Sequence, residues 1–231
     1  IWLERTALKH PNREALFLGH KCIGTYKDFW LAVCALRVHL EKEGIKRGDR
    51  VAVYMPNCPE FLLAFYSVWS LGAVILPINS KLHTREVKWI LGNAECTYLL
   101  GDAVLASELN QPNITVFTPK WDHLTTNSSV SPVLCSSDDL AWLFYTSGTT
   151  GKPKGVMITH GMIKTMALSY FADVDQVHPT DTTLYAAPMS HGAGLYSIMH
   201  VQAGARHAIP VSGSFDEDEI FDLAEKLQNI H

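Results

Sequence analysis

Residues 140 to 158 read Leu140-Ala-Trp-Leu-Phe-Tyr-Thr-Ser-Gly-Thr-Thr-Gly-Lys-Pro-Lys-Gly-Val-Met-Ile158. Apolar runs at 140–144 and 156–158 enclose a segment with three glycines, four Ser or Thr hydroxyls and two lysines. Short apolar runs bounded by turn residues predict strands, so we expect residues 140–160 to form two strands that flank a mobile loop. Glycines let a ligand approach the backbone closely, while hydroxyls, free N–H groups and lysines bind oxyanions. The segment therefore predicts a cradle for a polyphosphate.

The loop does not have the Walker pattern, because Gly148 and Gly151 are three residues apart and Lys152 is followed by Pro153. A flexible Gly/Thr hairpin without a ligand is the simpler alternative, although such a hairpin does not require two lysines among four hydroxyls. Residues 145–155 resemble, at every position, the phosphate loop of the adenylate-forming (AMP-binding) superfamily. That superfamily includes acyl- and aryl-CoA synthetases, luciferases and the adenylation domains of peptide synthetases.

The resemblance extends along the chain, through segments 52–57, 59–61, 70–74 and 77–79 in the family's order. Essentially the whole chain is similar to the N-terminal part of such enzymes. It contains no Tyr-Gly-x-Thr-Glu, no Thr-Gly-Asp and no late glycine-rich segment with a lysine. In the family these supply a magnesium-binding glutamate, a ribose-binding aspartate and the adenylation lysine. We therefore expect an incomplete N-terminal domain without its C-terminal domain, which binds ATP weakly at best and forms no acyl-adenylate alone.

The resemblance implies a role for each residue of the loop. The predicted nucleotide-binding residues are Thr146, Ser147, Gly148, Thr149, Thr150, Gly151, Lys152 and Lys154. Lys154 is also predicted to be catalytic, because it places a positive charge beside the β- and γ-phosphates of ATP. Lys152 has two interpretations that the sequence does not separate, a phosphate ligand or a solvated side chain.

A second segment, 187–194, reads Ala-Pro-Met-Ser-His-Gly-Ala-Gly. In acyl- and aryl-CoA synthetases a comparable segment carries a histidine or aromatic residue beside the acyl pocket, so the resemblance makes His191 a second catalytic candidate. The alternative is a histidine at a helix start that contacts no substrate. No aspartate lies between Tyr185 and Gln202, which disfavours activation of an amino acid. His160 is interpreted as structural, and the remaining histidines show no metal-ligand spacing.

The implied activity is that of an ATP-dependent acid–CoA ligase for a fatty or aryl acid, with ATP, Mg²⁺ and coenzyme A. An enzyme that uses a carrier-protein thiol, a non-catalytic nucleotide-binding module and a phosphohydrolase remain alternatives. The net charge of −4, from 19 basic and 23 acidic residues without a charged block, gives no sign of a nucleic-acid partner. Five scattered cysteines and no signal-peptide pattern fit a cytoplasmic protein.

Hydrophobic residues make up 47% of the 231 positions, enough to bury a substantial core. The uncharged stretch 61–78 is long enough to suggest a membrane span, but Gly72 and Pro77 favour a buried helix followed by a strand. Alternating elements predict an α/β fold with largely parallel sheets flanked by helices. Helices are expected at 25–43, 59–72, 84–91, 103–109, 161–172, 192–201 and 215–227, and strands at 50–55, 73–76, 97–100, 114–117, 183–187 and 206–209. We expect an α/β region over 1–135, a surface loop near 125–139, the hairpin, and a second α/β region from 161 to 231.

Overall fold

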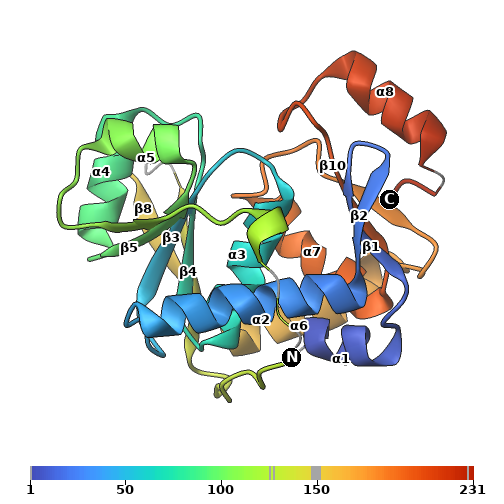
Figure 1. Cartoon of the computed structure of the whole chain (residues 1–231), viewed down its shortest axis with the longest axis horizontal. Helices are drawn as coiled ribbons and strands as arrows, with labels where there is room; N and C mark the ends of the chain where they lie inside the picture. The colour runs from blue at the N-terminus through green and yellow to red at the C-terminus, as the bar shows by residue number, and fades with distance from the viewer. Residues whose placement is uncertain (1, 125, 127, 147–151, 228) are drawn as a thin grey trace.

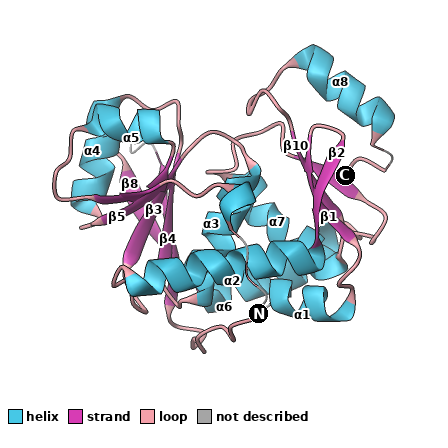
Figure 2. Ribbon diagram, viewed as in Figure 1, coloured by secondary structure: helices cyan, strands magenta, loops and turns pink. Residues whose placement is uncertain are grey.

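The computed structural model describes residues 2–124, 126, 128–146, 152–227 and 229–231. Two β-sheets stand apart with helices between them and on their outer sides (Figures 1 and 2). This arrangement confirms the predicted α/β fold with largely parallel sheets.

The larger sheet has six strands in the order β6-β5-β3-β4-β7-β8. Its neighbours are parallel except for the antiparallel pair of β7 and β8. The strands are β3 (Arg50–Tyr54), β4 (Val74–Ile78), β5 (Tyr98–Gly101), β6 (Thr115–Phe117), β7 (Leu140–Thr146) and β8 (Lys154–Thr159). Every residue of β4 and all but the first of β3 are buried, as expected for strands covered on both faces.

The smaller sheet has four strands in the order β2-β1-β10-β9. Its strands are β1 (Glu14–Leu18), β2 (Lys21–Thr25), β9 (Thr182–Leu184) and β10 (Arg206–Ile209). β1 pairs in parallel with β10, so the two regions that the sequence analysis separated share this sheet. No element was predicted in the first 24 residues, so the strands β1 and β2 and the helix α1 are additions that the structure makes.

Helices fill the space between the sheets and cover their outer faces. They are α1 (Trp2–Lys9), α2 (Tyr26–Lys42), α3 (Pro59–Ser70), α4 (Thr84–Asn93), α5 (Ala103–Leu109), α6 (His160–Ser169), α7 (Gly192–Ala203) and α8 (Glu217–Lys226). A short 3₁₀ turn (Trp121–His123) and a π turn (Tyr170–Val174) complete the set. In Figure 1, α4 and α5 lie on the far side of the larger sheet from α3, and α8 lies beside the smaller sheet.

The main hydrophobic core joins α1, α2, α3 and α7 to the facing sides of both sheets. Phe29 of α2, Phe65 of α3 and Trp142 of β7 are fully or almost fully buried there. The uncharged stretch 61–78 is thus the buried helix α3 followed by β4, as the sequence predicts. No helix in the described part of the chain is both long and apolar enough to cross a bilayer.

Local signals in the sequence account for the element ends. Thr25 and Asp28 form the expected capping box at the start of α2, where the Asp28 N–H donates to Thr25 Oγ1 at 3.3 Å and the Thr25 N–H to Asp28 Oδ2 at 2.9 Å. Gly72, with φ of +69°, makes the turn between α3 and β4. The strand expected over 183–187 is shorter in the structure and covers Thr182–Leu184. Beyond it, the carbonyls of Tyr185 and Ala187 accept from the side chain of Asn57, in the loop after β3.

Candidate nucleotide and acyl site

The predicted strands around the glycine-rich loop form a hairpin at the edge of the larger sheet. β7 and β8 pair antiparallel, with Thr146 opposite Lys154 and Tyr145 opposite Gly155. Thr146, Lys152 and Lys154 are therefore at the base of the loop. The other predicted phosphate ligands, Ser147, Gly148, Thr149, Thr150 and Gly151, lie outside the described residues, as does the expected mobility of the loop.

Helix α4 holds both sides of the loop base. The indole Nε1 of Trp89 donates to the Pro153 carbonyl at 3.3 Å, and the Tyr145 hydroxyl donates to Asn93 Oδ1 at 2.6 Å. The Lys152 ammonium lies 4.4 Å from the centre of the Trp89 ring, within cation–π range. This contact accounts for Lys152 without a phosphate, and both interpretations of this residue stay predictions.

The start of β8 packs closely against the far end of the Tyr145 side chain. A Cβ at Gly155 would lie 2.9 Å from the Tyr145 ring, closer than real contacts allow. The ring thus crosses the strand just beside Lys154, whose side chain is exposed next to the loop. The packing leaves that ammonium free to face solvent or an anion.

His191 lies against the strand that leads into the loop. It is the residue before α7, its side chain makes no cap hydrogen bond, and its Nδ1 is 3.0 Å from Ser190 Oγ. Its ring meets the Phe144 ring edge-on, with 5.6 Å between centroids. Phe144 is two residues before Thr146 on β7. The structure therefore brings the second predicted segment to the same end of the sheet as the loop, which is where open α/β sheets bind ligands.

A buried asparagine fixes this second segment, and its role was missed from the sequence. Asn57 follows β3 and donates to the carbonyls of Tyr185 at 3.0 Å and Ala187 at 2.9 Å. Its Oδ1 accepts from the Met189 N–H at 2.9 Å. The sequence signal was an amide side chain three residues after the end of a buried strand, but the partners of Asn57 lie about 130 residues along the chain.

A glycine completes the same turn. A Cβ at Gly194 would lie 1.9 Å from the Met189 carbonyl oxygen, so no larger residue fits without moving the backbone. Asn57 and Gly194 together hold residues 185–194 and thereby the backbone of His191.

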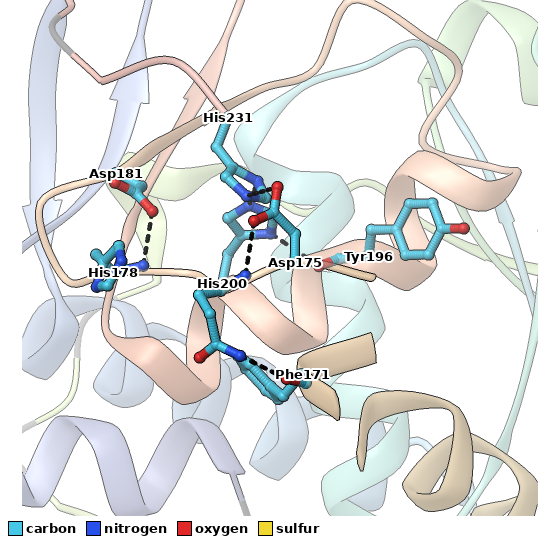
Figure 3. A network of polar contacts seen from close by, with 8 residues as sticks. Phe171, Asp175, His178, Asp181, Tyr196, His200 and His231 are labelled. Carbon is cyan, nitrogen blue, oxygen red and sulfur yellow. Dashed lines mark hydrogen bonds and ion pairs between the residues drawn. The ribbon is translucent and has the colours of Figure 1, made fainter. Parts of the chain in front are cut away.

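Other histidines form a polar network at the far end of α7 (Figure 3). His200 Nε2 is 3.0 Å from His231 Nδ1, and His231 Nε2 is 3.3 Å from Asp175. Burial is the main cause that lowers the pKa of His200 to about 4, and burial also holds the pKa of His207 well below its usual range. Among the described residues no three His, Cys, Asp or Glu side chains are grouped to hold a metal ion.

His160 begins α6 and is half-buried, with its ring 6.3 Å from that of Trp69. Burial lowers the pKa of His160, so the ring is neutral at pH 7. It lies at the start of β7, at the opposite end of the hairpin from the loop. This placement agrees with the structural role expected for it.

Comparison with known proteins gives a consistent assignment. The model of the AMP-binding enzyme family matches residues 3–229. A crotonobetaine/carnitine–CoA ligase from Salmonella paratyphi B is 36% identical over 205 residues, which are 79% of this chain and 37% of that ligase. The chain thus spans well under half the length of this relative.

Solved structures agree with that result. The inhibitor-bound N-terminal domain of FACL13 from Mycobacterium tuberculosis is 30% identical with a TM-score of 0.84, and the match covers 96% of this chain and 58% of that one. An o-succinylbenzoate CoA synthetase from Bacillus subtilis, in complex with its acyl-adenylate intermediate, is 25% identical with a TM-score of 0.84, over 99% of this chain and 60% of that one. With the family model matching nearly all of its residues, this chain belongs to the AMP-binding enzymes, the adenylate-forming superfamily that its motifs resemble.

Proposed function

We propose that this protein activates a carboxylic acid with ATP and transfers the acyl group to coenzyme A. In the first step a carboxylate oxygen attacks the α-phosphorus of ATP, the bond to the bridging oxygen breaks, and pyrophosphate leaves. In the second step the sulfur of coenzyme A attacks the acyl carbon, AMP leaves, and the thiol proton passes to solvent.

The main obstacle in the first step is charge, since an anion must approach a polyanion. Donors and cations fixed in place before the reaction stabilise the charge that develops on the leaving pyrophosphate. Thr146 and Lys154 stand at the base of the loop where such contacts are needed. ATP would enter as its Mg²⁺ complex, and the ion would neutralise part of the phosphate charge.

The observation that carries the proposal is the contact between His191 and Phe144. It joins the segment expected beside the acyl group to the strand that enters the phosphate loop. A carboxylate next to His191 would then be near a nucleotide held by the loop. A nucleotide hydrolase would need no acyl segment at this end of the sheet.

The relatives support the reaction class and leave the acid open. Their names refer to crotonobetaine or carnitine and to o-succinylbenzoate, which differ in charge and shape. Met189, which is buried, and Tyr196, which is exposed, flank His191 in this chain. We propose a fatty or aryl acid, because no carboxylate lies in segment 185–202 to hold a substrate ammonium group.

Exchange of labelled pyrophosphate into ATP by the full-length protein tests the proposal. His191→Ala should raise the KM for the acid and leave the KM for ATP unchanged, whereas His178→Ala, an exposed histidine away from the hairpin, should change neither. Equal kinetics for His191→Ala and wild type would remove His191 from the acyl site. Formation of acyl-CoA, measured separately, distinguishes coenzyme A from a carrier-protein acceptor.

A further inference from the structure

A cavity of about 380 Å³ lies away from the hairpin loop, between α1, α2, α3, α6 and the segment 132–137. Its inner wall carries three indoles, from Trp2, Trp30 and Trp69, together with Leu3 and Ile163. This volume is within the range of small-molecule sites. It is also far larger than one water molecule needs.

Two of the three indole N–H groups and the Ser70 hydroxyl are bonded to the protein, whereas Nε2 of His160, which also lines the cavity, is buried and has no hydrogen-bond partner among the described residues. Trp30 Nε1 donates to Ser129 Oγ at 2.8 Å, and Trp69 Nε1 donates to the Ala141 carbonyl at 2.8 Å. The Ser70 hydroxyl donates to the Ser67 carbonyl at 2.8 Å. The indoles therefore present ring surface to the cavity, which favours a flat apolar group.

The rim differs from the inner wall in charge. Ser136, Ser137 and Lys164 line it and are exposed. Lys164 is the one charged side chain among the described residues that line the cavity, and no carboxylate is among them. An apolar chamber with one lysine among the described residues of its rim favours a ligand with a negative group.

The cavity is separate from the proposed catalytic site. Ser137 and His160 adjoin the start of β7 and the end of β8, while the loop and His191 are at the other end of this hairpin. Six residue steps along β7, from Leu140 to Thr146 at the loop, correspond to roughly 20 Å, and the four steps to Phe144, which contacts His191, correspond to roughly 13 Å. A ligand in the cavity would not contact the nucleotide or the acid being activated.

We infer that this cavity is a second binding site, for a small amphipathic organic anion with a planar apolar body and one carboxylate or sulfonate. The body packs between the indoles of Trp30 and Trp69, and the anionic group lies beside Lys164 and the hydroxyls of the rim. This site depends on the geometry of the cavity and does not require the proposed ligase activity.

The test is calorimetric titration of the full-length protein with 2-naphthalenesulfonate and with its uncharged sulfonamide. A sulfonate serves as the probe because it is a poor mimic of a carboxylate substrate. We expect one site per chain whose affinity is unchanged by saturating ATP. Lys164→Gln should weaken the sulfonate about threefold, as for one exposed charge pair, and leave the sulfonamide unchanged.

Two variants that block the cavity test its location. Ile163→Trp fills the chamber, and Ser136→Trp covers the mouth from an exposed position, so it does not disturb the core. Both should reduce binding more than tenfold, while Met162→Trp, on the exposed side of α6, should have no effect. Binding that persists in Ser136→Trp, falls equally in Met162→Trp, or is lost with ATP present would overturn the assignment, as would no measurable binding.

Discussion

Replacing Asn57 by alanine should destabilise the fold, because it removes a buried amide that joins two segments distant in the sequence. Asn57 is 9% exposed and joins the end of β3 to the segment before α7. Alanine removes the amide without adding bulk. The change therefore isolates the hydrogen bonds that hold the backbone before His191.

The magnitude follows from the contacts that are lost. Asn57 makes three hydrogen bonds to backbone groups, two donated to Tyr185 and Ala187 and one accepted from Met189. Each contributes about 0.5–1.5 kcal/mol net, so the variant should lose about 3 kcal/mol of unfolding free energy. A loss of this size lowers the folded-to-unfolded ratio roughly 100-fold.

Urea unfolding followed by tryptophan fluorescence measures the loss, provided that the denaturant slope stays constant. Asn79→Ala is the matched control, because Asn79 follows β4 as Asn57 follows β3, but among the described residues its side chain accepts only a local bond from the Lys81 N–H. The control should lose less than about 1 kcal/mol. If both variants unfold at the same urea concentration, Asn57 does not hold this segment and the reasoning fails.

Three further predictions concern the loop base, the hairpin and the buried histidines. Lys154→Ala in the full-length enzyme should slow pyrophosphate exchange about 10- to 1,000-fold, as for loss of one preorganised contact, and an unchanged rate would exclude Lys154 from the mechanism. Gly155→Ala should lower the Tm, because the new Cβ meets the Tyr145 ring. Gly92→Ala should raise the Tm, because its Cβ meets nothing within 4 Å and alanine favours the helix in which it lies. The opposite order of the two Tm values would contradict the packing. The pKa of His200 is lowered to about 4 in the folded state, so between about pH 4 and 6.5 only the unfolded chain binds a proton at this residue. The free energy of unfolding should therefore fall as pH decreases through that window, and the contribution of His200 should be constant above it. His200→Gln should flatten that slope by up to about 1.4 kcal/mol per pH unit, and an unchanged slope in urea unfolding across pH would argue against a buried neutral His200.

Local patterns predict most elements of the larger sheet. Proline at the first position of α3 marks the start of that helix, and Gly72 marks its end. The apolar run that follows Gly72 forms β4. The smaller sheet is harder to predict, because β1 is a short run whose parallel partner β10 lies about 190 residues later. Nothing in residues 14–18 alone indicates that pairing.

The site shows the same division between local and distant information. The glycine-rich loop and His191 stand out as motifs, but the contact between His191 and Phe144 depends on how the chain crosses between the sheets. In the sequence, nothing distinguishes Trp89 from other helix residues. In the structure its ring contacts the Lys152 ammonium, and its indole N–H donates to the Pro153 carbonyl at the loop base. Such contacts require the three-dimensional arrangement, since residues far apart in sequence make them.

We propose that the loop between β7 and β8 and the segment at His191 serve one reaction, the adenylation of a carboxylic acid. Pyrophosphate exchange into ATP by the full-length protein, over a panel of short, long and aromatic acids, tests it most directly. We expect exchange that requires an acid, that is reduced by Lys154→Ala, and whose acid preference changes with His191→Ala. Release of phosphate from ATP without any acid, or the absence of exchange with every acid of the panel, would contradict it.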